Sequence, residues 1–134
     1  MSTRSMLLML LLSFAMVVAP APQSAHANDD FTRFCSEWMG KLAQRERDNL
    51  KTAEARPGSG GVVLEYTGYA TQPVRCVARI PQPGKPGVGI LVYMELRYRR
   101  SGSDLVQARS SDPAVVSQVE VTELFRFDGS RWLY

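Results

Sequence analysis

The sequence predicts an α+β domain in which one N-terminal amphipathic helix packs on an antiparallel meander sheet of four to five strands. Three observations predict this class. Apolar residues recur at steps of three and four over residues 30–55, the hydrophobic period changes to two after Gly61, and short segments rich in Gly and Pro separate the alternating runs. Alternation of apolar and polar residues along a strand is typical of an antiparallel sheet with one buried face.

The first 27 residues have the layout of a secretory signal peptide. Arg4 precedes an apolar run over residues 6–18, and Ala25 and Ala27 place small residues before a cleavage point at Asn28. The run is about 13 residues long, whereas a bilayer-spanning helix needs about 20. We therefore expect cleavage near Ala27, an exported domain over residues 28–134 (periplasmic or secreted), and a mature form that does not span a membrane. An uncleaved anchor is the alternative.

Composition limits what the mature chain can do. Removal of 27 residues from a chain of 134 leaves 107, the size of one domain. Arg4 and His26 are lost with the signal, so 15 basic and 13 acidic residues remain, a net charge of +2 that does not indicate nucleic acid. Without histidine there is no Ser-His-Asp triad, Cys-His pair or histidine metal site. We expect no metal and no cofactor.

The helix is predicted over residues 30–55. Asn28, Asp29 and Asp30 are suitable N-cap residues, and acids there complement the positive end of the helix dipole. One side is apolar, and the Pro57-Gly58 pair ends the pattern. The apolar positions are Phe31, Phe34, Cys35, Trp38, Met39, Leu42 and Leu50.

Alternating segments predict the strands, over residues 62–69, 74–80, 88–100 and 115–127. Residues 105–109 fit either a short strand or a helical turn, and Asp128-Gly129 predicts a hairpin into a short last strand at 131–134. Along residues 88–100 we expect the even-numbered side chains to face the helix. Trp38, Met39 and Leu42 would then pack on Val92, Met94 and Val121.

One helix followed by an antiparallel meander is similar to the element order of cystatin-like and NTF2-like folds. The similarity is one of order alone and spans the mature chain, so no function is carried over from it.

The two cysteines of the mature chain, Cys35 and Cys76, predict a disulfide. An isolated pair in an oxidising compartment usually forms one bridge. Two sulfurs without histidine are too few ligands for structural zinc, and the CxxC spacing of thiol oxidoreductases is absent. The bridge would tie the helix to the strand over 74–80.

Three mid-strand carboxylates are the candidates for acid–base catalysis: Glu65, Glu95 and Glu123. Two of them could reach the separation that a glycoside hydrolase needs if neighbouring strands align them. The alternative is a structural role in cross-strand pairs with arginine. Glu123 falls on an otherwise apolar face, so it is either buried with a partner or turned outward by a bulge.

Arginine outnumbers lysine 12 to 3 in the mature chain. We expect one sheet face, away from the helix, to gather a candidate binding surface that consists of Arg75, Arg79, Tyr93, Arg97 and Arg99. Guanidinium groups bind carboxylate and phosphate bidentately, and an aromatic ring among them suits a polysaccharide. The alternative is a solvated face neutralised by nearby glutamates.

These observations favour a small exported binding domain without catalytic activity, whose partner is an anionic glycan or an envelope protein. The second hypothesis is a small carboxylate-based hydrolase of the envelope. The third is a structural subunit of an envelope assembly, which the oligomeric state of the purified protein would distinguish.

Overall fold

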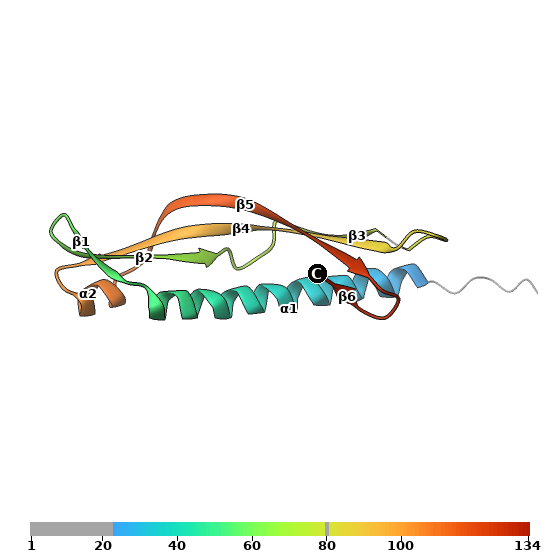
Figure 1. The fold of residues 1–134 in the computed structure, drawn as a ribbon, viewed down its shortest axis with the longest axis horizontal. Coiled ribbons are helices and arrows are strands. Elements are labelled where there is room, and N and C mark those ends of the chain that lie inside the picture. Colours follow the sequence, from blue (N-terminus) through green and yellow to red (C-terminus); the bar gives the residue numbers. More distant parts are fainter. Residues whose placement is uncertain (1–22, 80) are drawn as a thin grey trace, which may run out of the picture.

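The computed structural model of the protein describes residues 23–79 and 81–134, with side chains from residue 28 onward (Figure 1). It is an α+β fold with one long helix and a curled antiparallel sheet, which confirms the predicted class in its broad form. The elements are α1 (Gln23–Thr52), β1 (Ala55–Gly58), β2 (Gly61–Tyr69), β3 (Arg75–Arg79), β4 (Gly87–Gly102), α2 (Leu105–Ser110), β5 (Ala114–Phe127) and β6 (Trp132–Leu133).

The predicted signal peptide lies for the most part outside these residues. α1 begins at Gln23, upstream of the expected cleavage point at Asn28, so the cleavage itself stays a prediction. Over residues 23–79 and 81–134, no helix is long and apolar enough to cross a membrane.

The sheet is a meander in which β2 and β3 act as one interrupted strand. The strands lie in the order β1-β2-β4-β5-β6. β5 pairs with one edge of β4 from Gly87 to Arg99. β2 pairs with the C-terminal half of β4 and β3 with its N-terminal half, so both lie along the other edge of β4. Between them the chain bulges outward, held to β4 by bonds from the Ala70 N–H to the Met94 carbonyl (3.0 Å) and from the Val74 N–H to the Val92 carbonyl (2.7 Å).

The sheet has two faces with different residues. We call the side that bears Cys76, Leu91 and Phe125 the disulfide face, and the side that bears Val77, Ile90 and Leu124 the reverse face. Residues directly opposite one another on neighbouring strands share a face, so the strand register assigns every side chain to one of them.

The main core lies between α1 and the disulfide face. Phe31 is 1 % exposed and its ring lies 4.5 Å from that of Trp132 and 6.2 Å from that of Phe125. The buried members of this core are Phe31, Cys35, Met39, Leu42, Tyr69, Leu91, Tyr93, Phe125 and Trp132.

This packing corrects one expectation about β4. Leu91 and Tyr93 face α1, whereas the sequence pattern favoured Val92 and Met94; Val121 does pack against the core as expected. The reason is Gly89, on the same face, because a Cβ there would lie 2.1 Å from a Phe31 ring carbon. The missing side chain leaves room for the aromatic ring of the helix.

Farther along, α1 leaves the disulfide face and passes the free edge of β2. The Glu46 carboxylate accepts a hydrogen bond from the Tyr69 N–H (2.8 Å), and the Asn49 side-chain amide donates to the Thr67 carbonyl (2.9 Å). These bonds satisfy backbone groups at the edge of the sheet. Unpaired groups at such an edge can form hydrogen bonds with a strand of another chain.

α2 covers the reverse face at the end of the sheet away from β3 (Figure 1). Ala108 and Leu64 are both fully buried there, and the Arg100 guanidinium donates to the carbonyls of Arg109 (2.8 Å) and Ser111 (2.7 Å). α2 and the N-terminal half of α1 thus cover opposite faces of the twisted sheet.

The predicted hairpin at Asp128-Gly129 forms. The Asp128 N–H donates to the Arg131 carbonyl (3.0 Å), and the Asp128 carboxylate accepts from the backbone N–H groups of Ser130 and Arg131 (2.9 Å each). Gly129 has φ +105°, a conformation that side chains with a Cβ rarely adopt.

Acid should loosen this turn. The hydrogen bond from the Arg131 N–H and then those from Ser130 lower the pKa of Asp128 from 3.8 to about 2. Because the folded-state pKa lies below the unfolded value, the contribution to stability is complete above about pH 3.8 and is lost as the pH falls through about 2. We expect the side-chain carboxyl carbon of Asp128 to titrate near pH 2 by NMR. A midpoint near its ordinary value would contradict the hydrogen-bonded turn.

Candidate functional site

The predicted disulfide is present. Cys35 of α1 and Cys76 of β3 are bonded, with their Cα atoms 6.4 Å apart. The bridge joins the helix to the sheet and indicates an oxidising environment.

The expected single arginine face is not formed. Arg97 and Arg99 pair with Thr67 and Glu65 of β2 and share the disulfide face with Tyr93. Arg75 and Arg79 pair with Val92 and Val88 and therefore lie on the reverse face. The register between β3 and β4 differs by one residue from the register that the expectation needed, and a one-residue difference moves every side chain of a strand to the other face.

On the disulfide face, Arg97 and Arg99 both pair with one glutamate. Arg99 donates two hydrogen bonds to Glu65 (2.6 and 2.8 Å), and Arg97 lies 3.6 Å from the same carboxylate. The bond from Arg99, and then the positive charges of both arginines, lower the pKa of Glu65. This is the cross-strand pairing that the sequence left open as the alternative to a catalytic role for Glu65.

Tyr93 is not on an exposed surface. It is 5 % exposed, its ring lies 6.0 Å from that of Tyr69, and its hydroxyl donates to Glu123 (3.2 Å). Burial, and then the negative charge of Glu123, raise the pKa of Tyr93 to about 12. Glu123 lies on the disulfide face, one of the two placements that the pattern left open, and it accepts a hydrogen bond from this hydroxyl.

The three candidate carboxylates do not converge on one point. Glu95 is on β4, Glu65 lies opposite Arg99 of β4, and Glu123 lies opposite Leu91 of β4. The three carboxylates are therefore four residues apart along the direction of β4. Each step is about 13 Å, whereas paired catalytic carboxyl groups lie about 5–9.5 Å apart. Within residues 23–79 and 81–134, no cluster of three or more His, Cys, Asp or Glu residues could hold a metal ion.

The reverse face near β3 has a different character, which we call the arginine-rimmed face. An apolar row crosses three strands, with Val77 45 % and Leu124 62 % exposed. Arginines lie in the rows above and below it, and all three are exposed. The rows are Arg79–Val88–Arg126, Val77–Ile90–Leu124 and Arg75–Val92–Thr122.

This face has no negative charge of its own. None of its nine residues is acidic, and no ion pair found in the described part of the chain involves Arg75, Arg79 or Arg126. Val77, Leu124 and Arg126 were not among the predicted site residues. Alternation along the sequence places Leu124 and Arg126 on the face of the strand that Phe125 does not occupy. Only the strand register shows that the same face of the sheet bears Arg75 and Arg79.

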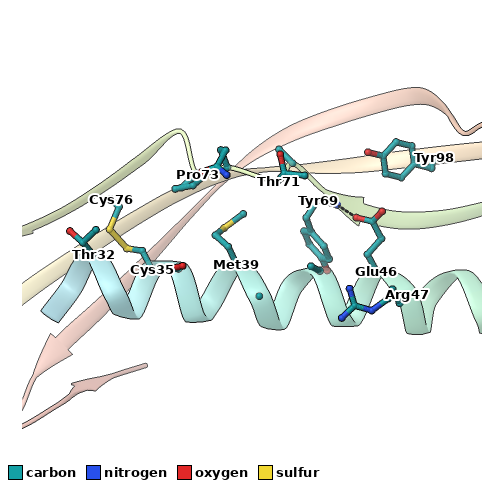
Figure 2. A pocket seen from close by; sticks show the side chains of 15 residues that line it. Thr32, Cys35, Met39, Glu46, Arg47, Tyr69, Thr71, Pro73, Cys76 and Tyr98 are labelled. Atoms are coloured by element: carbon teal, nitrogen blue, oxygen red, sulfur yellow. Dashed lines mark hydrogen bonds between the residues drawn. A yellow bond between two sulfur atoms is a disulfide. The ribbon is translucent and has the colours of Figure 1, made fainter. Parts of the chain in front are cut away.

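A separate hollow lies between α1 and the bulge that links β2 to β3. It is a cleft of about 550 Å³ (Figure 2). Figure 2 shows the disulfide at one end and the contact between Tyr69 and Glu46 at the other, with Met39 pointing into the space between them. The remaining wall is made by helix residues, by the bulge and by one residue of β4: Thr32, Ser36, Gly40, Ala43, Arg47, Ala70, Thr71, Gln72, Pro73 and Tyr98.

Comparison with known protein families, with curated proteins and with solved structures finds no match to this chain.

Proposed function

We propose that this protein is an exported, disulfide-stabilised binding domain that acts without catalysis, and that its arginine-rimmed face meets an acidic protein partner. The proposal includes cleavage near Ala27, and a helix-then-meander order similar to that of cystatin-like and NTF2-like folds. The single observation that supports it most is the exposed apolar row flanked by three arginines without ion-pair partners.

The composition of the face favours a partner over solvent. Exposed apolar rows on a sheet are uncommon unless something covers them, and protein interfaces are enriched in arginine and poor in lysine. The nine residues include three arginines and no lysine. Carboxylates on a partner would pair with the rim, while apolar side chains would cover Val77 and Leu124.

A protein suits this face better than a glycan. Sugars bind to proteins largely by stacking on aromatic rings, and the nine residues contain none. Arg75 and Arg79 are four residues apart on one strand, a separation of about 13 Å, with the apolar row between them. A partner segment with acidic side chains on both sides of an apolar anchor would match that spacing.

A photo-reactive residue tests the proposal inside the cell envelope. Benzoylphenylalanine at Leu124 in the exported protein should give a discrete cross-linked protein product. The control is the same residue at Val106, which is 79 % exposed but lies outside the arginine-rimmed face. Equal products from both positions, or none from Leu124, would contradict a protein partner on this face. Retention on an anionic polysaccharide without a protein product would favour the glycan instead.

A further inference from the structure

We propose that the cleft between α1 and the bulge binds a small anionic amphiphile, with its acyl or aromatic body along Met39 and its acidic head group at Arg47. This site is separate from the arginine-rimmed face and does not depend on it. The volume of about 550 Å³ is within the range of small-molecule pockets, about 300–1,000 Å³.

The floor of the cleft is apolar. The Met39 side chain, the Tyr69 ring and the Cys35–Cys76 bridge line it, and Met39 and Tyr69 are each only 8 % exposed. Methionine adapts its shape to an apolar guest because its side chain is unbranched and polarisable. A hydrocarbon chain or an aromatic ring would cover these groups.

Gly40 lines the cleft and adds no side chain to it. A Cβ at this position would have no heavy atom within 4 Å, so no close contact requires glycine there. Glycine in the middle of a helix is nevertheless unfavourable relative to alanine. No neighbouring part of the chain occupies the space beside Gly40, so this space belongs to the cleft.

The bulge offers unused hydrogen-bonding groups. The backbone N–H groups of Thr71 and Gln72 make no hydrogen bond with the described part of the chain, whereas those of Ala70 and Val74 on either side bond to β4. Thr71 and Gln72 both line the cleft. Such groups fix the orientation of a ligand whose body is held by apolar contact.

The Arg47 guanidinium, at the end of the cleft away from the disulfide, favours an anion (Figure 2). Glu46 and Arg47 are the two charged residues of the lining. The Glu46 carboxylate already accepts the Tyr69 N–H, whereas the Arg47 guanidinium contacts the neutral side-chain oxygen of Gln44 (2.6 and 3.2 Å). No ion pair in the described part of the chain includes Arg47, so its charge is available to a carboxylate, sulfonate or phosphate head group.

Titration of the purified, disulfide-bonded protein with decanoate tests this site, followed by calorimetry and by displacement of the fluorescent anion 8-anilinonaphthalene-1-sulfonate. We expect saturable binding to wild type and to Gly40→Ala, and its loss in Gly40→Leu, which fills the cleft. Arg47→Gln should weaken decanoate about tenfold while leaving the uncharged analogue decanol unchanged. Urea denaturation of each variant confirms that the fold is retained.

Three results would overturn the inference. The first is the absence of saturable decanoate binding to wild type. The second is equal affinity in wild type and Gly40→Leu. The third is binding that survives Gly40→Leu but is lost in Leu124→Ser, because the probe would then occupy the arginine-rimmed face.

Discussion

Replacing Cys35 and Cys76 with serine is expected to lower the free energy of unfolding by about 4 kcal/mol. The bridge joins residues 41 positions apart, and closing a loop of that length removes conformational entropy from the unfolded chain. Since single domains are stable by about 5–15 kcal/mol, this is a large fraction of the total. Urea denaturation of the double variant beside the oxidised wild type measures the loss.

Reduction of the wild-type protein is the matched control, since it breaks the same bond without changing the sequence. It should lower the urea midpoint as far as the double serine variant does. An unchanged midpoint in either case would mean that the bridge does not stabilise the contact between α1 and β3.

Truncation of Phe31 to alanine is expected to cost about 3–5 kcal/mol of stability. Its ring is buried against Trp132 and Phe125 and lies over Gly89 of β4, so its removal leaves a cavity at the centre of the main core. Urea denaturation again gives the magnitude.

Gly89→Ala tests the same contact from the strand. Its new methyl group would lie 2.1 Å from the Phe31 ring, so the ring must move and the variant should lose stability. In a Phe31→Ala background the methyl group has space, and the cost of Gly89→Ala should largely disappear. Additive losses in the double variant would contradict the packing of Phe31 on Gly89.

Local patterns in the sequence predicted much of the architecture. The 3.6-residue period predicted the long helix, alternation predicted the main strands, and the oxidising context predicted the disulfide between them. The short helix α2 was left ambiguous, although Asp104 caps it by accepting a hydrogen bond from the Gln107 N–H (2.9 Å) and Gln107 bonds back to the Ser103 N–H. The sequence signal for such a cap is an acid followed three residues later by glutamine, although here the glutamine bonds to the residue before the N-cap.

Alternation alone does not show which side of β4 packs against the helix. Both sides of its N-terminal half are apolar, with Val88, Ile90 and Val92 on one side and Leu91 and Tyr93 on the other. What decides the inward side is the helix residue that packs there, because Phe31 needs the space above Gly89. A glycine in a strand is a weak local signal, and its meaning depends on a contact 58 positions away along the chain.

The candidate site depended on register in the same way. Arg75 and Arg79 were predicted as site residues, but their neighbours on the sheet are Val92 and Val88, and Arg97 and Arg99 lie on the other side. The cleft was not anticipated, because the chain between β2 and β3 looks like an ordinary turn. Its role as one wall of a hollow follows only from the helix that lies opposite.

The most direct test of the arginine-rimmed face compares the two pairs of arginines on opposite sides of the sheet. Arg75→Gln/Arg79→Gln and Arg97→Gln/Arg99→Gln remove the same charge, and exposed ion pairs such as those of Glu65 contribute little to stability. The measurement is the yield of the cross-linked product from benzoylphenylalanine at Leu124. We expect the first pair of substitutions to abolish the product and the second to leave it unchanged. A product that survives loss of Arg75 and Arg79, or that disappears with Arg97 and Arg99, would contradict the assignment of this face.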